Sequence, residues 1–463
     1  MSSFASWGVP GSLELKPEIT APGGNIYSVN GLEQGGKGYE NMSGTSMAAP
    51  QIAGMSALFA QHYQAAGLSK TNRSVRHLAQ SLLMSTATPA REDATHYWSV
   101  LKQGAGVANI GAAITADSYV WMADSANKGA SDGKVKVELG EDAAKNGTYS
   151  FSFDLYDLSG TEQTYDLSAS FFTQAMTTIG GDRYLDEATA PLVANVTYGS
   201  AASGSSVTVP ANGHATVTVN IALTAEQKAA LDRDYSVGAY LEGYVFAQER
   251  TSAEGVSGTC HSIPVLGFYG SWTASSMFEV GDYYHYQSGE ETRMPYLGNA
   301  YTDNNVLYVK YASDNSPYSR GSVLGGNPVV NDSKYLPERN AINSENGDSI
   351  YYWKFCAIRN VADSRLQIIN KTTNTVLAEQ TLGHFLGAFY SQYFNPSEYV
   401  NLPLDWKPAG MKEGEQLELN LTLAPEYYVQ DDGSVNWASL GSGATQTFTA
   451  VIDNTAPVVN NVT

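Results

Sequence analysis

The stretch that decides how this sequence folds is Ser43-Gly44-Thr45-Ser46-Met47-Ala48-Ala49-Pro50. It places a glycine turn directly before a run of small and apolar residues that continues to Gln61. Apolar side chains cover nearly the whole circumference of a helix built from this run, which is typical of a helix inside a domain. A proline near the first turn costs little, because the first N–H groups of a helix have no intrahelical partner. The segment therefore predicts a buried helix over 45–61 with Ser46 at its start.

A serine at the start of a helix can take part in acyl transfer. The N–H groups there are unpaired and the helix dipole favours negative charge. The N–H of Ser46 can therefore point at a developing oxyanion, while its hydroxyl acts as the nucleophile. Position alone does not decide this, because most serines at helix starts only cap the helix.

The residues that follow predict two more helices in an α/β segment that ends near residue 125. An apolar stripe with helical spacing predicts a helix over 74–84. The glycines of Gln103-Gly104-Ala105-Gly106 break the chain, and a short helix is expected over 107–114.

From about residue 128 the pattern changes to the period of two that is typical of strands. A strand is expected over 149–155, and a hairpin is expected around the Asn212-Gly213 turn, between 207–209 and 217–221. Further strands are expected over 304–310, 366–369 and 417–423. Many short strands separated by turn residues favour β-sandwiches, and the length of this part suits two of them, over 128–272 and 273–455.

Composition limits the partners that this chain can have. Its 463 residues carry 46 acidic against 26 basic side chains, a formal net charge of −20, so nucleic acid and anionic membranes are not expected as partners. No apolar stretch is long enough to span a membrane. The first residues lack a signal peptide, and both ends are expected to be cut from a longer protein, with residues 456–463 as a linker into a further domain.

The residues that bind metals in proteins do not cluster in this sequence. Cys260 and Cys356 have no metal-ligand spacing and form no disulfide framework, so we expect two buried free thiols. An acidic loop at Asp431-Asp432-Gly433 leaves calcium possible, although Asp-Gly pairs mark turns more often than ions. No cofactor and no metal are predicted.

The segment around Ser46 closely resembles the nucleophile signature of the subtilisin-like serine proteases. Its Gly44, Thr45, Met47 and Pro50 match that signature, and Ser46 falls on the nucleophile position. The stretch 16–24, which contains Pro22 and Gly23, is similar to the family's strand and loop before the nucleophile. Residues 4–8 resemble the segment just ahead of that strand, and 103–106 resemble the closing segment. The matches occur in the family's order over about 110 residues.

Two further stretches narrow the resemblance to the lactocepin type of cell-envelope proteinase. Residues 263–272 are similar to the end of the first fibronectin-like domain of those proteins, and 453–457 resemble the junction that ends the second. The implied fold class is multidomain: an incomplete α/β subtilisin-like piece over 1–125, followed by two fibronectin type III-like β-sandwich domains. The resemblance implies an extracellular location on the cell envelope and a bacterial origin.

A serine nucleophile needs a base, a group that orients the base and oxyanion donors. In subtilisins the Asp, the His and the oxyanion Asn all precede the Ser, and the resemblance implies that they lie before Met1. His62 would be about 24 Å further along a continuous helix, out of reach of Ser46. His77, His96, His214, His261, His285 and His384 are expected to be structural.

Two functions remain open from the sequence. One is a fragment of a secreted serine endopeptidase that acts on protein or peptide substrates through an acyl-enzyme on Ser46, inactive alone because its base is missing. The other is a non-catalytic binding or spacer protein that carries a relic protease segment. The helices of residues 1–125 would expect a parallel sheet that is mostly missing, so exposed apolar surface is predicted there.

Overall fold

The computed structural model describes residues 1–8, 11–32, 35, 38–122, 132–199, 205–251, 258–279, 305–312, 321–326, 339–384 and 400–456. Contacts divide the chain into two compact units: Met1–Val9 with Leu13–Ser271, called unit 1, and Pro10–Ser12 with Trp272–Thr463, called unit 2. Each unit has its own hydrophobic core.

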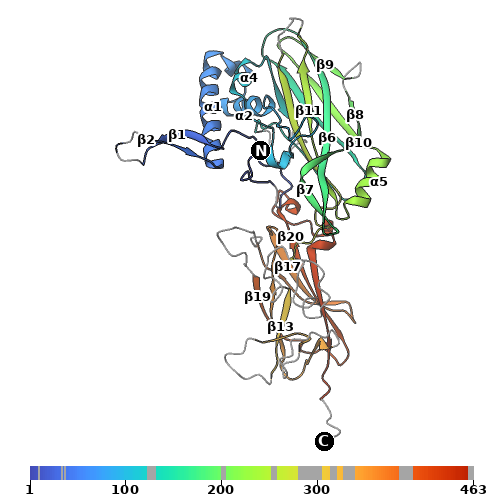
Figure 1. The fold of residues 1–463 in the computed structure, drawn as a ribbon. Coiled ribbons are helices and arrows are strands. Elements are labelled where there is room, and N and C mark those ends of the chain that lie inside the picture. The colour runs from blue at the N-terminus through green and yellow to red at the C-terminus, as the bar shows by residue number, and fades with distance from the viewer. Residues whose placement is uncertain are drawn as a thin grey trace. The chain divides into compact units, whose positions relative to one another are not determined.

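The helices of unit 1 come early in the chain, beside its sheets, except for α5, which follows β10 (Figure 1). They are α1 (Thr45–Ala65), η1 (Leu68–Thr71), α2 (Val75–Ser85), α3 (Val100–Gln103), α4 (Ile110–Thr115) and α5 (Ala225–Asp234). Ser74 caps α2 by accepting from the N–H of His77, which confirms the helix expected over 74–84. The last helix of the α/β segment starts later than expected, because Asn109 caps it and Val107 pairs with Thr88 instead.

Three sheets form the β part of unit 1. A separate antiparallel hairpin of β1 (Ile26–Asn30) and β2 (Gly38–Met42) leads into α1 and projects away from the helices (Figure 1). One sheet has the order β3-β5-β10-β8, and a six-stranded sheet has the order β4-β12-β11-β6-β7 with β9 also paired to β6. Their bounds are β3 (Ser118–Met122), β4 (Val137–Asp142), β5 (Thr148–Asp157), β6 (Gln163–Ile179), β7 (Asp182–Pro191), β8 (Ala194–Tyr198), β9 (Ser206–Val209), β10 (His214–Leu223), β11 (Ala239–Glu249) and β12 (Cys260–Tyr269).

The prediction that β9 and β10 pair with each other around the Asn212-Gly213 turn is wrong. The turn forms, and the N–H of Gly213 donates to the carbonyl of Pro210. However, both edges of β10 are taken, by β5 and by β8, so β9 pairs with β6 in the other sheet. The chain therefore crosses from one sheet to the other at this turn.

Residues from both large sheets meet in one hydrophobic core. Alternate side chains of β5 and β10, such as Phe153 and Val219, are fully buried there, as are Val245 of β11 and Val265 of β12. The period of two in the sequence is therefore the alternation of inward and outward side chains.

Unit 2 is also built from two sheets that share a core. Their orders are β14-β13-β16-β19 and β15-β21-β20-β17-β18. The bounds are β13 (Val306–Lys310), β14 (Ser322–Val323), β15 (Ala341–Ile342), β16 (Ser349–Phe355), β17 (Asp363–Asn370), β18 (Thr375–Thr381), β19 (Val400–Trp406), β20 (Gln416–Ala424) and β21 (Thr445–Ile452), with short helices η5 (Glu426–Tyr428), η6 (Trp437–Ser439) and η7 (Ser442–Ala444). The strands expected near 366–369 and 417–423 are confirmed as β17 and β20. The expected linker over 456–463 lies outside the described residues, except for Ala456.

The expectation that the first helix is buried on all sides is wrong. Phe59 is the buried residue of α1, and Leu58 is 54% exposed. One face of α1 packs on η1, α2 and α4, which leaves the opposite apolar face uncovered by the described residues. The apolar pattern of the sequence thus predicted the helix, but it did not predict how much of the helix surface is covered by other elements.

Candidate nucleophile site

Ser46 lies exposed in the first turn of α1 and does not cap the helix. The capping position belongs to Gly44, which makes no side-chain cap bond, and Thr45 is the first helical residue. Among the described residues, neither the hydroxyl nor the N–H of Ser46 has a hydrogen-bond partner. Pro50 is the sixth residue of α1, just past the first turn. The structure thus removes the capping explanation and leaves an available hydroxyl beside an available N–H.

One loop, residues 22–25, holds the turn before Ser46 in place. The N–H of Gly44 donates to the carbonyl of Gly23 at 2.8 Å. The hydroxyl of Ser43 accepts from the N–H of Asn25 at 2.8 Å. The side chain of Gln51, one turn into the helix, donates to the carbonyl of Pro22 at 2.6 Å. The loop that contains Pro22 and Gly23 therefore positions the turn that presents Ser46.

The glycine-rich segment 103–106 crosses close behind this loop. The N–H of Ala105 donates to the carbonyl of Glu18, and the N–H of Thr20 donates to the carbonyl of Gly106. Gly104 and Gly106 both have positive φ, and a Cβ on Gly104 would lie 2.2 Å from the carbonyl oxygen of Pro17. Only glycine allows this approach. Segments more than 80 residues apart in sequence are thus joined next to the loop that contacts the nucleophile turn.

Two side chains of strand β11 hydrogen-bond to the segment that contains α3 and Gly104. The fully buried carboxylate of Glu242 accepts from the Ser99 hydroxyl at 2.5 Å and from the N–H of Val100 at 2.8 Å, at the start of α3. The hydroxyl of Tyr244 donates to the carbonyl of Gly104 at 2.8 Å. Burial raises the pKa of Glu242 to about 7. The sequence did not predict these contacts of Glu242 and Tyr244, because their partners lie about 140 residues away in sequence.

The structure places no described histidine in hydrogen-bond contact with Ser46. His62 lies more than four turns beyond Ser46 on the same helix, with its ring tilted against Phe59. His77 lies in the first turn of α2 and its ring contacts Trp121. His96 pairs with Asp93 at 2.8 Å in an exposed loop, and this hydrogen bond lowers the pKa of Asp93. A base paired with an orienting carboxylate resembles part of a triad, but no described contact links it to the serine.

The remaining described histidines are held by other contacts. His261 is fully buried between the hydroxyls of Ser85 and Ser118, at 2.9 and 2.8 Å, and burial lowers its pKa to about 3. It is therefore a neutral structural residue. His214 is exposed and stacks on Tyr156, while His384 belongs to unit 2. His285 lies outside the described residues.

The acidic loop of unit 2 is a turn. The hydroxyl and the N–H of Ser434 donate to the carboxylate of Asp432, and the N–H of Gly433 donates to the carbonyl of Gln430. Within the described ranges, no group of three Asp, Glu, His or Cys side chains could hold a metal ion. Among the helices that are described, none is long and apolar enough to cross a membrane.

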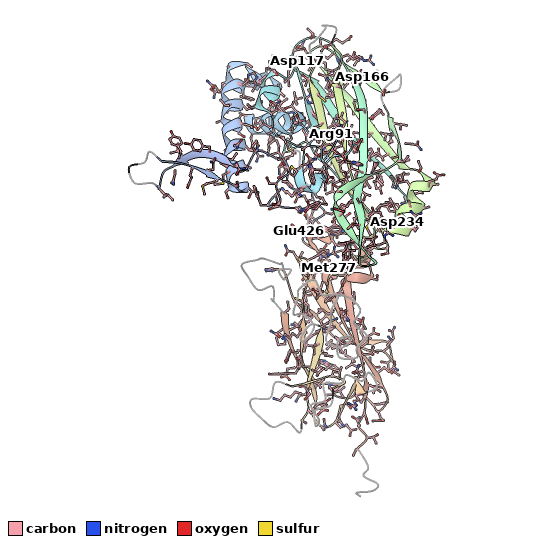
Figure 2. The ribbon with its side chains drawn as sticks, viewed as in Figure 1. Arg91, Asp117, Asp166, Asp234, Met277 and Glu426 are labelled. Atoms are coloured by element: carbon pink, nitrogen blue, oxygen red, sulfur yellow. The ribbon has the colours of Figure 1, made fainter. Side chains whose placement is uncertain are left out.

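The expectation of two buried thiols is confirmed for Cys356 and wrong for Cys260, which is exposed. Cys260 is the first residue of β12, and it lines a cavity of about 730 Å³ between that strand and the loop after α2. Arg91 and Asp117, labelled in Figure 2, line the same cavity. An end position in a strand exposes a side chain that the strand centre would bury.

An exposed serine at a helix start, beside an unpaired N–H and a glycine-containing loop, is an arrangement that acyl transfer can use. Residues 1–132 match the model of the subtilase family, and residues 137–266 match the model of the Fn3-like domain. These matches confirm the resemblance to subtilisin-like proteases with fibronectin-like domains.

Curated relatives extend the similarity over nearly the whole chain. The PI-type proteinase of Lactococcus lactis subsp. cremoris is 26% identical over 465 residues, which cover 96% of this chain and 21% of that protein. The PII-type proteinase of Lacticaseibacillus paracasei is 27% identical over 81% of this chain and 18% of its own length. The C5a peptidase of Streptococcus pyogenes is 31% identical over 60% of this chain and 21% of its own length. The chain spans about a fifth of the length of the relatives it matches.

Proposed function

We propose that this chain carries the nucleophile segment of a subtilisin-like serine endopeptidase, with Ser46 as the nucleophile. The observation that carries the proposal is that the polar groups of Ser46 have no hydrogen-bond partner among the described residues. Its hydroxyl and its N–H are both available in the first turn of α1, and capping does not account for it. The match of residues 1–132 to the subtilase family supports the same role.

In the proposed reaction the Ser46 oxygen attacks the carbonyl carbon of a peptide bond. The hydroxyl proton passes to a histidine, and the N–H of Ser46 donates to the oxyanion that forms. Collapse of this intermediate breaks the C–N bond, and the leaving amine takes the proton from the histidine. Water then releases the acyl group from Ser46. The histidine, its aspartate and an oxyanion asparagine come from chain outside these 463 residues, so the isolated chain is nearly inert.

We place the subtilisin-like piece at 1–125 and assign fibronectin type III-like sandwiches to 128–272 and 273–455. The two sheets that share a core in each unit support this assignment. The relatives are named proteinases and a peptidase, which supports a protein or peptide substrate for the complete enzyme. An extracellular, cell-envelope location fits the same family.

A fluorophosphonate probe, which labels activated serines, tests the role of Ser46. The longer chain that includes the upstream Asp and His segment is expected to be labelled and to cleave casein. Ser46→Ala should lower both by at least about a thousandfold. The 463-residue chain alone should be labelled no more than its own Ser46→Ala variant.

The matched control is Ser56→Ala on the same helix, whose hydroxyl donates to the carbonyl of Ile52. It should keep full labelling, because that hydroxyl bonds only within the helix. Persistent labelling of the longer Ser46→Ala chain would assign the nucleophile to another residue and overturn the proposal.

A further inference from the structure

A row of three stacked rings crosses the sheet β3-β5-β10 in unit 1. Tyr119 lies opposite Tyr156, and Tyr156 lies opposite His214. The ring centroids are 4.9 and 4.8 Å apart, and the ring planes lie within 20° of parallel. The row begins at Tyr119, which is 3% exposed, and ends at the exposed His214. Strand β8 pairs with β10 only from Val219 onward, so among the described residues no ring continues the row.

Two cationic side chains, Lys70 and Arg73, line a cavity beside this row of rings. Lys70, Arg73, Tyr156 and His214 line one cavity of about 330 Å³. The guanidinium of Arg73 lies over Trp121, 3.6 Å from the ring centroid, and 5.6 Å from the centroid of Tyr156. These contacts hold the guanidinium in one orientation and leave most of its five N–H donors available.

Two carboxylates lie near these cations without forming an ion pair with them. Asp157 lines the same cavity, and its carboxylate accepts from the N–H groups of Ser159 and Asn212, at 2.7 and 2.6 Å. Asp154, further along the same strand, accepts from the hydroxyl of Thr216 at 2.6 Å. Within the described part of the chain, no carboxylate forms an ion pair with Lys70 or Arg73. Both cations of the cavity are therefore open to an anionic ligand, although the chain as a whole has a net charge of −20.

We propose that this cavity binds the carboxylate or phosphate group of a small ring-bearing ligand, in the class of uronic acids and sugar phosphates. The anion would pair with Arg73 and Lys70, because a fixed guanidinium suits both groups. The ring of the ligand would stack on the exposed end of the row at His214, as sugars and aromatic rings do on flat side chains. The volume is at the small end of ligand sites, which limits the ligand to about one sugar unit.

Isothermal titration of the full 463-residue chain with glucose 6-phosphate, glucuronate and inorganic phosphate tests the site. Glucose serves as the neutral probe. At least one ring-bearing anion is expected to bind more tightly than inorganic phosphate, and glucose should not bind. Lys70→Met should weaken binding about tenfold, the cost of one charge-assisted contact. His214→Ala should weaken the ring-bearing anions and leave inorganic phosphate unchanged.

Arg76→Met is the matched control, because Arg76 is a nearby exposed cation outside this cavity. It should bind as the unchanged chain does. The binding result for Arg73→Met is interpreted only if circular dichroism shows that this variant is folded, since Arg73 also packs on Trp121. The proposal is overturned if no probe binds up to about 10 mM, or if Arg76→Met weakens binding as much as Lys70→Met. The relative affinities for glucuronate and glucose 6-phosphate then distinguish a carboxylate ligand from a phosphate ligand.

Discussion

Gly23 and Gly44 lie so close that the backbone of one loop meets the backbone of the other. The N–H of Gly44 donates to the carbonyl of Gly23, and a Cβ on Gly23 would lie 2.7 Å from the carbonyl oxygen of Gly44. No flexible side chain stands at that contact, so the added carbon can be accommodated only by moving a loop. Since Gly44 precedes the first turn of α1, any such movement shifts Ser46.

Gly23→Ala is expected to lower the free energy of unfolding of unit 1 by about 1–3 kcal/mol, the usual cost of forcing an extra carbon into packed structure. Chemical denaturation followed by circular dichroism measures it. Gly24→Ala is the control, because the nearest atom to its new Cβ is the Ser2 hydroxyl oxygen at 3.6 Å, an ordinary contact. Equal loss in both variants would mean that the contact with Gly44 is not the cause.

At the scale of elements, α3 depends on strand β11 for its start. The buried carboxylate of Glu242 accepts from the N–H of Val100, the first residue of α3, which has no partner inside the helix. Its second oxygen, Oε1, is buried without a hydrogen-bond partner. A carboxylate in this position favours its protonated form, which agrees with a pKa raised by burial to about 7.

Glu242 should make unit 1 less stable as pH rises. Its pKa is raised from 4.5 to about 7, so between these values the folded chain binds more protons than the unfolded chain. The free energy of unfolding therefore falls with rising pH. From about pH 5 to about pH 8 the loss from this group is about 2 to 3 kcal/mol.

Glu242→Gln should remove this pH dependence, because the amide does not titrate while its oxygen can still accept from α3. Denaturation at both pH values measures the difference. Glu162→Gln, at an exposed position, should keep the slope of the unchanged chain. A slope that survives Glu242→Gln would assign the effect to another group.

At the scale of the whole molecule, exposed apolar residues gather at the start of the chain. Of the 17 large apolar side chains that are exposed among the described residues, ten lie within residues 1–75. An apolar cavity of about 550 Å³ lies between α1 and α2, lined in part by Ile52 and Val75. The exposed apolar surface predicted for residues 1–125 is therefore present. A surface of this kind is typical of a face that another part of a protein covers.

A dye that fluoresces on apolar surface should therefore bind the native chain. Val75→Gln, at the apolar cavity, should lower the fluorescence by roughly a third, because a polar group enters the patch. Val376→Gln on β18 of unit 2 should change it little, although Val376 is also 51% exposed. A native chain that leaves the dye dark would contradict this account.

Local sequence patterns were enough to predict several of the helices and strands and the position of the candidate nucleophile. The glycine turn and the apolar run around 43–61 predicted α1 and placed Ser46 at its start, since helix formation depends on residues three or four apart. The alternation in 149–155 and 417–423 predicted β5 and β20 for the same reason. The order of the motifs along the chain, and not any spatial fact, indicated the family.

The tertiary structure alone decided which segments meet. It paired β9 with β6 and not with β10, left one face of α1 exposed, put Cys260 at a strand end and joined Glu242 to α3. It also brought Arg73 and His214 to one cavity. Each of these depends on contacts between residues far apart in sequence, which local periodicity does not encode because many partners offer the same apolar or hydrogen-bonding surface.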